Sequence, residues 1–164
     1  MKPKFSSDYG GMQCRVCLVR EGETDTVRIR NPEDVYQLVK DDLANSDREM
    51  LLSVMLATSG HLIGVEVVSI GTLNASHVSP REIFKSAILA NACSIILCHN
   101  HPSGQLNASV EDHRITDTIA EAGKLLDIRL ADHIIVSHRG FKSLREEEYF
   151  LSISACPTVI NPHR

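Results

Sequence analysis

Two histidines and an aspartate near the middle of the chain have the residue types and the spacing of a metal site. His99 and His101 close an apolar run, and Asp112 follows one loop later, where a helix is expected to begin. Because His99 and His101 are alternate residues of an extended segment, their imidazoles should point to the same side. Two imidazoles and one carboxylate are the three protein ligands of a catalytic zinc site, whose fourth position is left to water. The pattern therefore predicts a Zn²⁺ site formed by His99, His101 and Asp112.

The same residues also have a purely structural interpretation. Ser109 and Asp112 have the spacing of a capping box, with Ser109 as the N-cap and Asp112 as the third helical residue. The two histidines would then be polar residues at the end of a strand. A capping box needs no histidines upstream, so the combination favours a metal site over a cap alone.

Hydrolysis of an amide at such a site needs a carboxylate that takes a proton from water and returns it to the leaving amine. The candidates are Glu49, Glu66 and Glu82. Glu82 is expected to complete a capping box with Ser79, and Glu66 lies inside an apolar strand segment. Glu49 stands at the start of a long apolar run, although it also has the spacing of a capping partner for Ser46. The residues alone leave this choice open.

Other polar residues near the motif are assigned different roles. Ser109 is a candidate to donate its hydroxyl proton to a developing oxyanion. Cys98 is expected to point to the opposite face of the strand, into the core. We do not expect His113, His133 or His138 to bind the metal, and His133 is interpreted as a residue that could orient a group lying behind the ligands.

The composition is that of one globular domain with a substantial core. Of the 164 residues, 43% are hydrophobic and 23% are charged. The formal net charge of −4 argues against tight binding of nucleic acid, which usually needs a basic surface. Neither a membrane span nor a signal peptide is apparent, and an odd number of cysteines, five, argues against a disulfide framework. We therefore expect a cytoplasmic protein with no membrane partner.

Hydrophobic periodicity predicts an α/β fold in which helices cover a mixed sheet. Residues 1–30 are interpreted as an arm with strands, residues 31–150 as the domain and residues 151–164 as a tail. Cys14 and Cys17 form a Cys-x-x-Cys that we assign to a strand in the arm rather than to a metal site. Helices are expected to begin after Asn31, Ser79 and Ser109, and Gly123 marks the expected end of the third. Strands are expected at residues 26–30, 50–57, 62–70, 94–98, 128–136 and 141–144.

The spacing of the two histidines, Ser109 and Asp112 resembles the JAMM motif of JAB/MPN-domain metalloproteases. More narrowly, residues 69–76, 80–85, 99–104 and 132–136 resemble the bacterial RadC family. This resemblance covers residues 31–146 and implies a three-layer α/β/α, cytidine-deaminase-like JAB/MPN fold with a zinc ion. It also implies metal ligation by His99, His101 and Asp112, a general base at Glu49 and an oxyanion-stabilising role for Ser109.

The resemblance leads us to expect a zinc-dependent metallohydrolase, a peptidase or isopeptidase-like enzyme acting on a peptide or protein. The alternative is a nucleic-acid-binding protein of DNA repair or mobile-element biology, with a structural metal. RadC proteins typically carry an N-terminal helix-hairpin-helix region that binds DNA, and with about 30 residues before the domain we do not expect that region here. A scaffold that pairs through an edge strand such as residues 26–30 is a third hypothesis, but it would need no metal ligands.

Overall fold

The computed structural model describes residues 27–71 and 78–146 of the chain. Its elements in chain order are α1 (Pro32–Leu43), β1 (Met50–Leu56), β2 (Leu62–Ile70), α2 (Pro80–Leu89), β3 (Ser94–Asn100), α3 (Val110–Leu126), β4 (Arg129–Ser137) and β5 (Gly140–Ser143). The strand expected around Cys14 and Cys17 and the expected tail at residues 151–164 lie outside the described residues. None of the helices in the described ranges is long and apolar enough to cross a lipid bilayer.

The five strands form one mixed sheet in the order β2-β1-β3-β4-β5. β1 pairs antiparallel with both β2 and β3, β3 pairs parallel with β4, and β4 pairs antiparallel with β5. β3 is therefore the middle strand, and every one of its residues is buried. A strand that is covered on both faces is apolar on both sides, which explains the unbroken run from Ile95 to Cys98.

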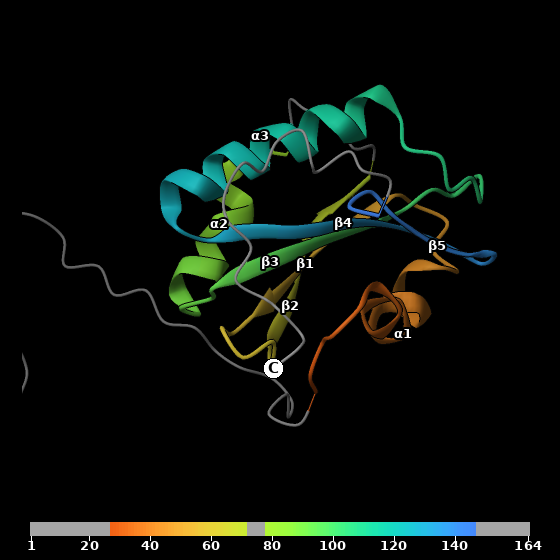
Figure 1. Cartoon of the computed structure of the whole chain (residues 1–164). Coiled ribbons are helices and arrows are strands. Elements are labelled where there is room, and N and C mark those ends of the chain that lie inside the picture. Colours follow the sequence, from red (N-terminus) through yellow and green to blue (C-terminus); the bar gives the residue numbers. More distant parts are fainter. Residues whose placement is uncertain (1–26, 72–77, 147–164) are drawn as a thin grey trace, which may run out of the picture.

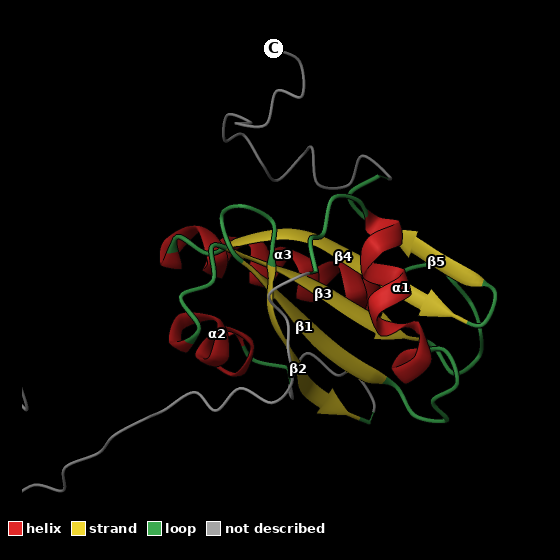
Figure 2. Cartoon of the chain, turned by 90° about the horizontal axis from the view of Figure 1, so that it is seen from below, coloured by secondary structure: helices red, strands yellow, loops and turns green. Residues whose placement is uncertain are grey.

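Helices cover both faces of the sheet and give the α/β/α layers that we expected. α2 and α3 lie on one face and α1 lies on the other, as Figure 1 and the turned view in Figure 2 show. Alternate residues of β3 therefore enter two separate cores. Ile95 and Leu97 pack in the core that contains α2 and α3, whereas Ile96 and Cys98 pack in the core that contains α1. Cys98 points into the core, as its position in the strand predicted.

Local capping signals decide where α1 and α3 begin. The side chain of Asn31 accepts a hydrogen bond from the backbone N–H of Asp34, and Asp34 accepts one from the backbone N–H of Asn31. Ser109 and Asp112 form the same reciprocal pair at the start of α3. Both predicted helix starts are confirmed, and the second places Asp112 in the first turn of α3.

Two predictions based on short sequence patterns are wrong. α2 begins at Pro80 after Ser79, as predicted, but no capping box forms: the backbone N–H of Glu82 donates to the Ser79 carbonyl oxygen at 3.0 Å, and the Glu82 carboxylate pairs with Lys85 at 2.9 Å. The strand expected at residues 26–30 is reduced, within the described residues, to one bridge between Arg28 and His61 beside the start of β2.

Gly123 does not end α3, contrary to our prediction. The helix continues to Leu126, and Asp127 takes the left-handed conformation at its C-cap with φ of 56°. A Cβ atom on Gly123 would lie 2.4 Å from the carbonyl oxygen of Ile128. Glycine is therefore needed inside the helix because the chain passes close to it on its way into β4.

Candidate metal centre

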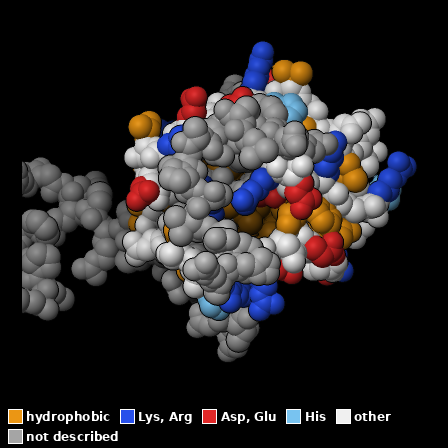
Figure 3. Space-filling model, viewed as in Figure 1, with side chains coloured by type: hydrophobic (Ala, Val, Ile, Leu, Met, Phe, Trp, Pro, Cys, Tyr) orange, Lys and Arg blue, Asp and Glu red, His pale blue; other side chains and the backbone are white. Residues whose placement is uncertain are grey.

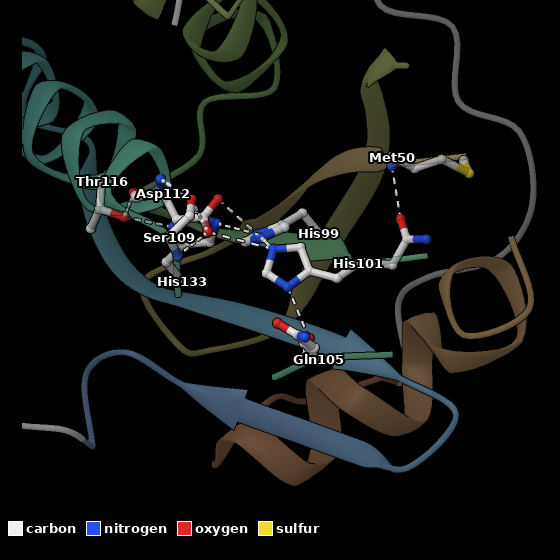
Figure 4. Close-up of polar contacts among 9 residues, drawn as sticks. Met50, His99, His101, Gln105, Ser109, Asp112, Thr116 and His133 are labelled. Carbon is white, nitrogen blue, oxygen red and sulfur yellow. Dashed lines mark hydrogen bonds and ion pairs between the residues drawn. The ribbon is translucent and has the colours of Figure 1, made fainter. Parts of the chain in front are cut away.

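His99, His101 and Asp112 meet where β3 ends and α3 begins (Figure 4). The Nε2 atoms of the two histidines are 3.0 Å apart. Asp112 places Oδ1 3.2 Å from Nε2 of His99 and Oδ2 3.5 Å from Nε2 of His101. Ligands bound tetrahedrally to zinc at about 2.0–2.1 Å lie about 3.3 Å from one another. The spacing of these three groups therefore fits one small cation.

A hydrogen bond on the far side of the His101 ring fixes its protonated nitrogen. Nδ1 of His101 lies 2.8 Å from the backbone carbonyl oxygen of Gln105. A carbonyl oxygen only accepts hydrogen bonds, so Nδ1 carries the proton. Nε2 of the neutral ring then presents a lone pair to His99 and Asp112.

A buried relay of two side chains fixes His99 in the same way (Figure 4). Thr116 Oγ1 donates its single proton to the carbonyl oxygen of Asp112 at 2.6 Å, so it accepts from Nδ1 of His133, also at 2.6 Å. Nε2 of His133 is then free to accept from Nδ1 of His99 at 2.8 Å. His99, Thr116 and His133 are at most 1% exposed, so water does not compete for these bonds. Nε2 of His99 is left with a lone pair that faces the other two groups.

Two imidazole lone pairs and a carboxylate that face one another repel unless a positive charge lies among them. In the protein alone, the hydrogen bond to Asp112 raises the pKa of His101 and so favours a proton on that ring. Burial alone would raise the pKa of Asp112, but its contacts with His101 and His99 outweigh it and hold that pKa well below its ordinary range. Burial lowers the pKa of His133 and keeps that ring neutral. A divalent cation would supply the same positive charge to these donors.

Glu49 is the fourth group near this point. A carboxylate oxygen of Glu49 and one ring nitrogen each of His99 and His101 all lie within 4.8 Å of one another. Glu49 comes directly before β1, whose Leu51 pairs with His99. Its carboxylate is therefore near enough to bind the same ion or to act on a water molecule beside it. Glu66, the alternative base, lies within β2.

Ser109 holds the carboxylate of Asp112 in place. Its backbone N–H and its hydroxyl each donate to Oδ2 of Asp112 at 2.7 Å, and its Oγ accepts from the backbone N–H of Asp112 at 3.1 Å. The cap interpretation is therefore confirmed, and it coexists with the cluster of histidines. The proposed donation from Ser109 to an oxyanion remains a prediction, since its hydroxyl proton is engaged by Asp112 in this structure.

Asn100, between the two histidines, ties the segment that carries Glu49 to β3. Its Oδ1 accepts from the backbone N–H of Met50 at 2.8 Å, and its Nδ2 donates to the carbonyl oxygen of Arg48 at 3.0 Å. The side chain is 2% exposed, so both bonds are shielded from water. Asn100 therefore sets where Glu49 lies relative to His99.

The sequence patterns did not identify Asn100 or Thr116 as residues of the site. Thr116 could have been found, because it follows Asp112 by four residues in a helix and so lies on the same face. No local pattern marks Asn100, whose partners lie about 50 residues away in the chain. His133, expected to orient a group behind the ligands, instead contacts His99 directly, with its Nε2 2.8 Å from Nδ1 of His99.

Comparison with known proteins identifies the family of this fold and site. The family described as the RadC-like JAB domain matches residues 29–149, which is most of the chain. The chain belongs to the RadC family. The resemblance carried by the motif residues is thereby confirmed for the RadC domain as a whole.

Curated relatives of this RadC domain are similar over the same region. It is 48% identical over 121 residues to the UPF0758 protein of Desulforamulus reducens, and this alignment covers 74% of this chain and 53% of that protein. It is 43% identical over 122 residues to the UPF0758 protein of Methanosarcina mazei, with the same two coverages. For UPF0758 protein TTE0897 of Caldanaerobacter subterraneus the identity is 42% over 136 residues, covering 83% of this chain and 58% of that protein. The chain spans about half the length of the curated relatives it matches.

Proposed function

We propose that this RadC domain is a zinc-dependent metallohydrolase, a peptidase or isopeptidase-like enzyme that cleaves an amide bond in a peptide or protein. One observation carries the proposal: lone pairs of His99 and His101 and the carboxylate of Asp112 face one another at 3.0–3.5 Å. Hydrogen bonds on the far side of each ring hold the lone pairs in that direction. Membership in a JAB-domain family, which is related to JAMM metalloproteases, supports the same conclusion.

In the proposed reaction, His99, His101 and Asp112 hold the ion. Zinc supplies a Lewis acid there, which polarises a carbonyl oxygen and makes water a stronger nucleophile. Glu49 takes a proton from the attacking water and returns it to the amide nitrogen as the C–N bond breaks. The products are a carboxylic acid and an amine. Ser109 donates its hydroxyl proton to the developing oxyanion, for which it must turn away from Asp112.

Metal content is the first test of this proposal. Wild-type protein purified in the presence of zinc should contain about one zinc per chain by inductively coupled plasma mass spectrometry, as a three-ligand site predicts. The double variant His99→Ala, His101→Ala should contain none. His61→Ala is a matched control, because this exposed imidazole bonds only to Ser59 among the described contacts. A folded wild-type protein without zinc would refute the proposed ligand set.

The second test separates a base from a ligand. Glu49→Gln should keep its zinc and lose hydrolysis of a peptide and isopeptide panel by about 10²–10⁴-fold, the usual contribution of a general base. Glu66→Gln, which changes the alternative glutamate, should behave as wild type. Loss of zinc from Glu49→Gln would make Glu49 a ligand, in agreement with its proximity to both histidines.

The same panel tests the alternative function. If zinc-loaded wild type and Glu49→Gln are equally inactive on every substrate, the metal has a structural role and the hydrolase proposal fails. A nucleic-acid-binding protein with a structural metal should then bind DNA with an affinity that falls steeply as salt rises, because binding releases counterions from phosphates.

A further inference from the structure

A cavity lies at the opposite end of β3 from the histidines, on the other face of the sheet. Its volume is about 760 Å³, and it is bounded by the end of β1, the starts of β3 and β4, and the segment that enters α1. Ser94 and Ile96 of β3 line it, and Ile96 belongs to the core on the α1 side. At about 3.3 Å per residue, Ser94 and His99 are about 17 Å apart along the strand. The cavity is therefore separate from the candidate metal centre.

Arginine is the charged residue that predominates around this cavity. The arginines in its lining are Arg28, Arg30, Arg129 and Arg145. Over residues 27–71 and 78–146, none of their guanidinium groups forms an ion pair with a carboxylate. Two of them are instead anchored to the backbone: Nε of Arg28 donates to the carbonyl oxygen of Ser59 at 3.1 Å, and Nη1 of Arg145 to that of Ala131 at 3.4 Å.

Two carboxylates of the lining offset part of this positive charge. They belong to Asp132 and Glu146. Asp132 accepts from the Ser143 hydroxyl and the His133 backbone N–H, both at 2.7 Å, and from the Arg145 backbone N–H at 3.2 Å, so its oxygens are already engaged by groups other than the guanidinium ends. Four arginines thus outnumber the two carboxylates around one cavity of a chain with net charge −4, and a bound anion would relieve the repulsion among them.

The floor of the cavity is mostly apolar. It includes Leu56 and Ile96, which are at most 6% exposed, and Ala131, beside the polar Ser94 and Asp132, which are at most 7% exposed. Figure 3 shows hydrophobic side chains beside basic and acidic ones on the side of the molecule that Figure 1 presents. The volume falls in the range of about 300–1,000 Å³ that is typical of small-molecule sites. A ligand that fits both features has a charged end and an apolar or aromatic body.

We propose that this cavity binds a phosphate ester with an aromatic body, of the nucleotide class. The planar fork of a guanidinium group matches two oxygens of a phosphate, and a phosphate carries more charge and more acceptor oxygens than a carboxylate. Arg28, Arg129 and their neighbours hold the phosphate, and the apolar floor receives the base. The site needs neither the metal nor Glu49, so it stands independently of the proposed hydrolysis.

Isothermal titration calorimetry with four probes tests this proposal: AMP, inorganic phosphate, a ten-residue oligothymidylate and pentaglutamate. AMP should bind more tightly than inorganic phosphate, and the double variant Arg28→Gln, Arg129→Gln should weaken AMP binding at least tenfold. The matched control is Arg81→Gln, Arg114→Gln, which removes two exposed arginines paired with glutamates on α2 and α3. This control should leave AMP affinity within twofold of wild type. Arg129→Lys preserves charge and folding but removes the fork, and should weaken AMP binding several-fold.

The outcomes distinguish the sources of the ligand. Tighter binding of AMP than of the oligothymidylate supports a free nucleotide, and the reverse order supports a nucleic-acid strand that offers the same chemistry. The proposal is overturned if AMP does not bind at millimolar concentration, if the control pair weakens AMP as much as the cavity pair, or if pentaglutamate binds best. Binding of inorganic phosphate as tightly as AMP would also overturn it, because the apolar floor would then contribute nothing.

Discussion

Replacing Thr116 with valine tests the relay that orients His99. The substitution keeps the shape of a fully buried side chain and removes one oxygen atom. That oxygen accepts from Nδ1 of His133 and donates to the carbonyl oxygen of Asp112, each at 2.6 Å. The carbonyl of Asp112 keeps a partner, because the backbone N–H of residue 116 bonds to it within α3. The only group left without a partner is therefore Nδ1 of His133.

The magnitude follows from the two ways in which the ring can respond. If His133 keeps its proton on Nδ1, a buried unsatisfied N–H costs about 1–3 kcal/mol of unfolding free energy. If the His133 proton moves to Nε2 of that ring, Nδ1 of His99 must accept it as a hydrogen bond. His99 then carries its own proton on its Nε2, which no longer offers a lone pair to the metal. Either response lowers zinc affinity, and loss of a partner behind a metal ligand typically weakens binding about 10–100-fold. This factor corresponds to about 1.4–2.8 kcal/mol.

Zinc affinity is measured by competition with a chromophoric chelator, and the stability of the metal-free protein by urea unfolding. Thr118→Val is the matched control, since Thr118 also donates to a carbonyl oxygen one turn earlier, that of Arg114 at 2.8 Å, but on the exposed side of α3. We expect zinc affinity to fall by about 10–100-fold for Thr116→Val and to change less than twofold for Thr118→Val. A folded Thr116→Val protein with wild-type zinc affinity would refute the relay.

Three further predictions address other parts of the domain. Zinc affinity should fall by up to tenfold for each unit that the pH is lowered beneath the raised pKa of His101, because the ion displaces a proton from that ring. A titration between pH 5 and 8 measures this slope, and an affinity that does not change with pH would contradict it. Asn100→Ala should keep zinc affinity within threefold of wild type but lower kcat, because it frees the segment that carries Glu49. An equal loss of zinc affinity and kcat would instead assign Asn100 a role in orienting the metal ligands. Gly123→Ala should lower the unfolding free energy measured in urea by about 1–3 kcal/mol, because the added Cβ would meet the carbonyl oxygen of Ile128. This cost should outweigh the better helix propensity of alanine. An increase in stability would show that the close approach relaxes.

In the metal-free protein, the His101–Asp112 pair should make stability fall as pH rises, whereas zinc affinity should rise with pH. The folded pKa of His101 lies above its unfolded value because of the hydrogen bond to Asp112. The stabilisation from this pair is therefore complete below a pH of about 6.5 and is lost as the pH rises through the folded value. Urea unfolding of metal-free protein from about pH 7 upward should show that decline, because His133, whose lowered pKa makes stability rise with pH, contributes to the pH dependence only below its unfolded pKa of about 6.5; a rise above pH 7 would contradict the assigned pair.

Features that depend on neighbouring residues could be predicted from the sequence. Asn31, Pro32 and Asp34 fix the start of α1 by contacts within one helical turn, and the structure agrees. The side-by-side placement of His99 and His101 follows from strand alternation alone. Short patterns were wrong where a competing contact existed, as at Glu82, which binds Lys85.

Features that depend on strand register could not be predicted. His133 reaches His99 because β3 and β4 run parallel with Leu97 opposite His133, and nothing in either segment encodes that offset. Gly123 gave a misleading signal for a similar reason. A residue without a side chain is required at position 123 because Ile128 approaches it from outside the helix. A sequence pattern cannot distinguish a glycine needed for such a close approach from one that ends a helix.

The central place of β3 has a consequence for how the site opens. His99 lies on a strand that is hydrogen-bonded on both sides, so its amide should exchange with solvent deuterium only through near-global unfolding. Glu49 lies outside the strands, and the buried Asn100 side chain ties its segment to β3. Local opening of that segment, detectable as faster amide exchange at residues 46–49, would move Glu49 away while the two imidazoles stay in place. In the proposed hydrolase, such an opening would interrupt proton transfer without releasing the ion from the two histidines.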